Sequence, residues 1–319
     1  MNRRAPPARP ARRAQRGAAL LTAMIIVTLV VTLSAAMVWQ QYRAVQVEQA
    51  ERARTQSAWI LNGALDWAVL ILREDGRTGG PDYLGEPWSV PLAEARLSTF
   101  LAVDRENTDD APDAFLSGSI TDLQSRYNLR NLYNDSTVIT EEVEALQRLC
   151  TTAGVSTDVA STVAVALAAA QARRSGQNSA DAPLPPRSVS QLGWLGLDAD
   201  TVKRLAPLVV LLPARTPVNV NTASREVLSS VVKGLDLASA ERLVQMRQRS
   251  HFRNLQEVEA QVPNLGPLNA QQLSVSSNYF EVQGKLRLVD RVLEQRSLVQ
   301  RQGRAATILQ REIVSSTEP

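Results

Sequence analysis

The chain has 319 residues, with 35 Lys and Arg against 32 Asp and Glu, and a pI of about 9.3. Six of the basic residues and none of the acidic ones lie within residues 1–17, so the rest of the chain is slightly acidic. The high pI is therefore a property of the N-terminus and does not indicate a nucleic-acid-binding surface. One cysteine, Cys150, and one histidine, His251, exclude an internal disulfide and offer no Cys/His set for a metal site or a nucleophile.

The first 39 residues predict a membrane anchor. Arginines end at Arg16-Gly17, and residues 18–39 form a run of 22 residues without a charge, Gly or Pro. As a helix this run reaches roughly 33 Å, enough to cross the hydrocarbon layer of a bilayer. Because arginines hold the N-terminal side in the cytoplasm, we expect the rest of the chain outside the inner membrane of a bacterium. A plain signal anchor shares these features, but Gly17, at the near end of the apolar run, favours a pilin-type leader cleaved there.

A single long helix is predicted to run from the anchor to about residue 75. No proline lies between Pro10 and Pro81, and Gly63 is the only glycine between Gly17 and Gly76. The second half of this helix has apolar residues at three-four spacing, which gives one packing face. These residues are Ala58, Leu61, Leu65, Val69 and Leu72. Glycine and proline within residues 76–81 then end the helix.

Four segments of the chain carry recognisable motifs: residues 16–34, 117–132, 216–228 and 276–315. Together they resemble the minor pseudopilin K family of the type II secretion system (general secretion pathway protein K). In that family prepilin peptidase cuts after the leader glycine and methylates the new N-terminus, which the resemblance carries to Gly17 and Ala18. Most pilins have Glu five residues after the cut, where it pairs with a neighbour's N-terminal ammonium. This chain has Thr22 there, and lacking the Glu is typical of protein K, whose place is the pseudopilus tip.

Alternating strands flank a helical middle region. Residues 279–288, 292–302 and 307–314 predict an antiparallel meander, which joins an earlier strand near Ile120. From Thr140 onward the spacing becomes helical. The fold class is therefore α+β: a pilin-like fold, as the resemblance also implies, with a long N-terminal transmembrane helix packed on an antiparallel sheet and interrupted by a large inserted all-α domain. The expected parts are a prepilin leader (1–17), a transmembrane helix (18–39), the first part of the pseudopilin fold (40–135), the inserted domain (136–275) and C-terminal strands (276–319).

An internal repeat within the insertion raises DNA binding as an alternative function. The ten-residue segments that begin at Gly196 and Gly234 match at Gly, Leu, Asp, Arg and Leu, so each predicts a glycine turn and an Asp-capped helix. The second segment, with Asn219-Val220-Asn221 before it, resembles the helix-hairpin-helix modules of competence DNA receptors, which bind phosphate through backbone N–H groups. Asp236 replaces the second glycine of that hairpin and places a negative charge where a phosphate would approach. We therefore expect no nucleic-acid binding.

The resemblance to protein K also implies a function, partners and a cofactor. It implies a subunit at the tip of the pseudopilus, which initiates or caps assembly for protein export across the outer membrane. The implied partners are the minor pseudopilins I, J and H, the major pseudopilin G, prepilin peptidase and the inner-membrane secretion platform. A family member of known fold type binds calcium, and Asp75, Asp82 and Glu86 offer hard oxygen ligands, although helix-end and turn acids are the alternative interpretation. A type IV pilus minor pilin is the alternative family, and no motif supports an enzyme.

Overall fold

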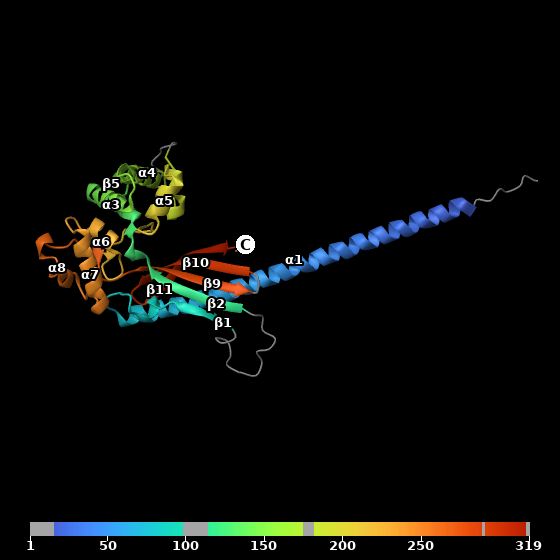
Figure 1. Cartoon of the computed structure of the whole chain (residues 1–319), viewed down its shortest axis with the longest axis horizontal. Coiled ribbons are helices and arrows are strands. Elements are labelled where there is room, and N and C mark those ends of the chain that lie inside the picture. The colour runs from blue at the N-terminus through green and yellow to red at the C-terminus, as the bar shows by residue number, and fades with distance from the viewer. Residues whose placement is uncertain (1–15, 98–113, 175–181, 289–290, 317–319) are drawn as a thin grey trace, which may run out of the picture. The chain divides into compact units, whose positions relative to one another are not determined.

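The computed structural model describes residues 16–97, 114–174, 182–288 and 291–316, and the chain divides into two compact units, residues 1–59 and 60–319 (Figure 1). The first unit contains the first part of helix α1 (Arg16–Thr78). In its apolar run the hydroxyls of Thr22, Thr28 and Thr32 donate to backbone carbonyls three or four residues earlier, so they need no partner outside the helix. The lack of proline explains why one helix continues for 63 residues.

The second unit contains an antiparallel five-stranded sheet in the order β1-β2-β9-β10-β11. Its strands are β1 (Leu92–Arg96), β2 (Ala114–Asp122), β9 (Tyr279–Leu288), β10 (Arg291–Gln302) and β11 (Ala305–Ser316). The predicted C-terminal meander is confirmed, and Gly303 forms its last turn with a φ of 55°. Strand β1 adds an edge that the sequence did not predict.

A helical region lies between β2 and β9 in the chain and beside one end of the sheet (Figure 1). Its α-helices are α3 (Thr140–Ala153), α4 (Asp158–Arg174), α5 (Ala199–Leu205), α6 (Arg225–Val231), α7 (Leu237–Arg249) and α8 (Leu255–Glu259). Two-residue strands, which the sequence did not predict, connect its segments. They are the parallel pairs β3 (Tyr127–Asn128) with β6 (Val209–Val210) and β7 (Val218–Asn219) with β8 (Leu273–Ser274), and the antiparallel pair β4 (Tyr133–Asn134) with β5 (Thr137–Val138).

The part of α1 that belongs to the second unit packs on the sheet. Leu61, Leu65 and Leu72 are buried against strand residues, as the three-four spacing predicts. In the same cluster as Leu65 and Leu72, the Trp88 ring packs edge to face on the Phe280 ring, with 5.2 Å between the ring centroids. Burying one such leucine contributes about 1.5–3 kcal/mol, so this face fixes the helix on the sheet. The helix ends at Thr78, before Gly79 and Gly80, which both have positive φ.

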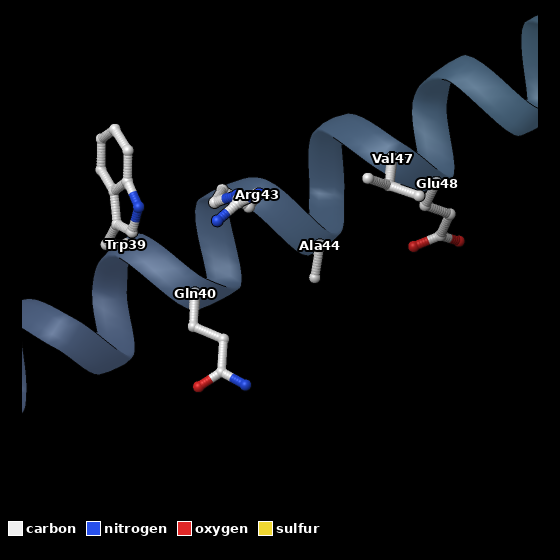
Figure 2. Close-up of a pocket in the computed structure, with 6 residues that line it drawn as sticks. All are labelled: Trp39, Gln40, Arg43, Ala44, Val47 and Glu48. Atoms are coloured by element: carbon white, nitrogen blue, oxygen red, sulfur yellow. The ribbon is translucent and has the colours of Figure 1, made fainter.

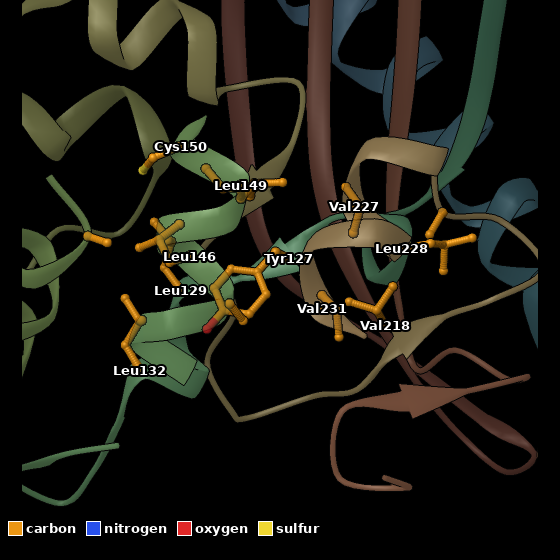
Figure 3. Packing of buried hydrophobic residues seen from close by; sticks show 14 of the residues in the cluster. Tyr127, Leu129, Leu132, Leu146, Leu149, Cys150, Val218, Val227, Leu228 and Val231 are labelled. Atoms are coloured by element: carbon orange, nitrogen blue, oxygen red, sulfur yellow. The ribbon is translucent and has the colours of Figure 1, made fainter. Parts of the chain in front are cut away.

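The core of the helical region begins earlier in the chain than the expected boundary at residue 135. Figure 3 shows Tyr127 and Leu129 packed with Leu146 and Leu149 of α3. The strand expected near Ile120 is β2, and it ends at Asp122 because the Asp122 carboxylate accepts a hydrogen bond from the Gln124 N–H and starts a 3-10 turn (Leu123–Ser125). Residues after this turn therefore pack with the insertion and not with the sheet.

Candidate functional site

The apolar half of α1 is the candidate membrane anchor. Within the described residues, α1 is the one helix long and apolar enough to cross a membrane, and its most apolar stretch has no buried residue. Large apolar side chains from Leu20 to Trp39 are more than half exposed all round the helix. Such a surface is costly in water and favourable in lipid. The Gly17–Ala18 bond lies in the first turn of α1, while residues 1–15 of the predicted leader lie outside the described residues.

A shallow hollow follows the anchor on the surface of the same helix (Figure 2). It is lined by Trp39, Gln40, Arg43, Ala44, Val47 and Glu48, all of which are exposed. Because one helix supplies every residue, the hollow has no opposite wall and lacks the enclosure of a small-molecule site. An indole and a guanidinium at the end of an apolar run are typical of a helix leaving the membrane at the headgroup level.

The three predicted calcium ligands come together in the second unit. The carboxylate oxygens of Asp75, Asp82 and Glu86 lie within 4.8 Å of one another. Asp75 is in the last turns of α1, and the other two lie in the loop before a 3-10 turn (Pro87–Ser89). The structure therefore brings the three predicted residues together, whereas calcium binding itself stays a prediction.

Arg301 of β10 enters the same cluster, which the sequence did not predict. Its Nη2 lies 2.6 and 2.7 Å from the two oxygens of Asp82, and its Nη1 pairs with Asp75. Asp82 also accepts the Ser277 N–H at 2.6 Å. Calcium requires six to eight oxygens at about 2.3–2.6 Å, and here a guanidinium holds the position that such an ion would take. The residues present therefore do not fit a calcium ion while Arg301 is in place.

Burial controls the protonation of the cluster. Burial raises the pKa of Asp82, although the hydrogen bond and charge of Arg301 oppose the rise. Burial raises the pKa of Glu86 to about 7, against the hydrogen bonds that it accepts from the Tyr83 N–H and the Trp88 indole. Near neutral pH a large part of Glu86 is thus protonated, which lowers the negative charge beside the two aspartates.

A second buried carboxylate joins the helical region to the sheet. Asp122 accepts hydrogen bonds from Thr222 Oγ1 at 2.5 Å, Ser277 Oγ at 2.7 Å and Asn219 Nδ2 at 3.1 Å. Asn219 also donates to the backbone carbonyl of Asp82. Burial raises the pKa of Asp122 to about 6, partly opposed by the hydrogen bonds from Thr222, Ser277 and the Gln124 N–H. Sequence analysis found the Asn219-Val220-Asn221 segment but not its role, which is to connect the loop that contains Asp82 with the segment that contains Ser277.

The helix-hairpin-helix segment has a carboxylate at the start of its second helix. Gly234 turns the chain with a φ of 86°, and Asp236 caps α7 by accepting the Ser239 N–H at 2.8 Å. This hydrogen bond from the Ser239 backbone lowers the pKa of Asp236 and keeps the carboxylate charged. Gly196 and Asp198 begin α5 in the same way, which confirms the internal repeat. The carboxylate therefore uses the helix-terminal donor that a phosphate would need.

The single cysteine and the single histidine do not form a reactive site. Cys150 is buried in the helical core, and burial raises the pKa of its thiol to about 11. A protonated thiol is a poor nucleophile. His251 stacks on the Tyr83 ring at 3.8 Å between centroids, a packing contact between the loop after α7 and the loop after α1.

Comparison with known proteins identifies the family. Two family models, both described as type II secretion system protein K, match residues 125–214 and 218–276. The type II secretion system protein K of Pseudomonas aeruginosa is 29% identical over 304 residues, covering 88% of this chain and 87% of the relative. The chain belongs to the type II secretion system protein K family. It is a minor pseudopilin of that system.

A further relative from the same family aligns with nearly the whole length of this chain. Protein K of Pectobacterium carotovorum is 27% identical over 329 residues, covering 93% of this chain and 96% of the relative. Among solved structures, the chain resembles one in the GspK–GspI–GspJ complex of the enterotoxigenic Escherichia coli type 2 secretion system, with a TM-score of 0.63 and 20% identity. That match covers 84% of this chain and 99% of the solved one, and it confirms the predicted fold class.

Proposed function

We propose that this minor pseudopilin lies at the tip of the pseudopilus, where it initiates or caps assembly. Residues 18–39 anchor it in the bacterial inner membrane as a single span, and the rest of the chain lies in the periplasm. Prepilin peptidase removes residues 1–17 and methylates Ala18. The role is structural and not enzymatic, in line with the buried thiol of Cys150 and the stacked His251.

The observation that carries the tip position is Thr22. A subunit added below another needs a carboxylate at this place to neutralise its neighbour's N-terminal ammonium in an apolar bundle, where an unpaired charge costs several kcal/mol. The Thr22 hydroxyl instead donates to the Ala18 carbonyl at 2.5 Å within its own helix. A subunit with this side chain cannot pair with the N-terminal ammonium of a subunit above it. At the tip there is no subunit above, so this pairing is not needed there.

We further propose that α1 contacts the other minor pseudopilins through a stripe on its exposed face, defined by Gly63, Trp67 and Leu70. These residues follow an i, i+4, i+7 spacing opposite the buried leucines. Trp67 and Leu70 are 56% and 59% exposed, and a Cβ on Gly63 would meet no atom within 4 Å. A glycine beside exposed apolar side chains lets a second helix approach closely. The E. coli complex, which joins a similar chain to GspI and GspJ, supports such partners.

Substituting Gly63 tests this assignment. Gly63→Leu has space within its own chain and improves helix propensity by roughly 0.8–1 kcal/mol, so the protein should fold. It should nevertheless lose co-purification with the partner minor pseudopilins of its own secretion system, because the new side chain separates the helices. Gly193→Leu is the matched control, since Gly193 is also exposed with no atom within 4 Å of an added Cβ. Full complex formation by Gly63→Leu would refute the proposed stripe.

A further inference from the structure

The acidic cluster is arranged like a cation site that already contains its cation. Asp75 comes from the end of α1 and Asp82 from the loop that follows it, whereas Arg301 comes from β10, far away in the sequence. Asp82 and Arg301 are 2% and 7% exposed. A buried carboxylate of this kind requires a positive partner, because removing it from water is costly.

The contacts of Arg301 use most of its hydrogen-bonding capacity. Nη2 donates to both oxygens of Asp82 and to the Ser277 carbonyl at 2.8 Å, while Nη1 pairs with Asp75. The guanidinium carbon lies 4.8 Å from the centre of the Phe280 ring, which covers one side. A planar cation with several fixed donors suits this arrangement better than a lysine would.

Three of the other carboxylate oxygens in the cluster already accept hydrogen bonds. Glu86 Oε2 accepts from the Tyr83 N–H at 3.0 Å and the Trp88 indole at 2.8 Å. Both oxygens of Asp82 are used by Arg301 and by Ser277. A divalent ion would need at least six oxygens and would lie beside a permanent positive charge.

We propose that Arg301 is the resident cation of the Asp75–Asp82–Glu86 cluster and replaces a divalent metal there, so that this junction forms without calcium. The guanidinium makes the same connection that a bound ion would make, between the end of α1, the following loop and β10. This inference concerns the cluster alone and does not depend on the tip position or on the partners of the protein.

The test compares melting temperatures of the full-length protein in detergent micelles, with calcium at about 1 mM or with a chelator. We expect the wild-type protein to melt at the same temperature in both conditions. Arg301→Met removes the charge and leaves the carboxylates without a partner, so it should melt lower in chelator and rise by about 5 °C with calcium. Arg296→Met is the matched control on the same strand, where the side chain is half exposed, and it should show no response to calcium.

A second measurement keeps the proposal testable if Arg301→Met does not fold. Terbium, a luminescent calcium substitute, would be excited by Trp88, whose indole contacts Glu86. The tryptophan-sensitised terbium emission of the wild-type protein should not decrease when Glu86 is replaced in Glu86→Gln. Terbium emission or calcium stabilisation that is present in the wild type and absent in Glu86→Gln would overturn the proposal. A folded Arg301→Met variant whose melting temperature does not change with calcium would also overturn it. Equal emission and equal calcium response in the wild type and in Glu86→Gln would support the proposal, because no ion is then bound at the cluster.

Discussion

Asp122→Asn should change how the stability of the protein depends on pH. The Asp122 carboxyl is fully buried where β2 ends, and burial raises its pKa to about 6 from an ordinary value of 3.8. A folded-state pKa above the unfolded one means that the folded protein binds the proton more tightly. The protonated Asp122 carboxyl therefore makes its full contribution to the free energy of unfolding below about pH 4. This contribution is lost as pH rises toward 6 and stays lost above it. A shift of about two pKa units corresponds to about 3 kcal/mol.

The assay is urea unfolding of the full-length protein in detergent micelles, followed by near-UV circular dichroism between about pH 4 and 7. Asparagine does not titrate, so the free-energy difference between wild type and variant should fall by about 2.4 kcal/mol over this range, since the unfolded carboxyl is already partly ionised at pH 4. Titration of Glu86 occurs in both proteins and largely cancels in the difference. A difference that grows as pH rises would refute the reasoning, since it would mean that the donors from Thr222, Ser277 and Asn219 outweigh burial.

Three further predictions follow from other parts of the molecule. Gly76→Ala should lower the free energy of unfolding by about 1–3 kcal/mol, because the added Cβ overlaps the Gly303 carbonyl oxygen. Urea unfolding measures this loss with Gly193→Ala as the control variant, and equal stabilities of the two variants would contradict the packing. The protein should show no salt-sensitive affinity for duplex DNA, because Asp236 caps α7; fluorescence anisotropy at about 0.15 M salt measures it, and submicromolar binding would reverse the conclusion. Thr22→Glu should leave secretion nearly unchanged, since a tip subunit has no neighbour above it; a strong loss of exported protein would argue for a position within the fibre.

Local and periodic features could be predicted from the sequence. The anchor follows from a run of residues without charge, and the end of α1 from Gly79 and Gly80. The repeat follows from two Gly-Leu-Asp turns, each with the chemistry of a helix cap. The meander follows from alternation with a period of two residues. In each case the determining residues are close together in the sequence.

The buried polar contacts could not be predicted, because their partners are far apart in the chain. Arg301 lies 226 positions from Asp75, and Asn219 lies 97 positions from Asp122. One signal was present: Val299 faces the core, and Arg301 lies two residues later on the same face of β10. An inward arginine requires a buried acid, so this alternation could have identified the missing member of the cluster. The early end of β2 depends likewise on the single cap made by Asp122.

The mature N-terminus tests the central claim, that the chain is a processed pseudopilin anchored by α1. Intact-mass and peptide mass spectrometry of the protein extracted from membranes should find Ala18 as the first residue, carrying one methyl group. Gly17→Val should block this processing, because a β-branched side chain crowds a peptidase site shaped for glycine. An unprocessed chain in cells with an active prepilin peptidase, or a first residue elsewhere, such as after Ala36, would contradict the account.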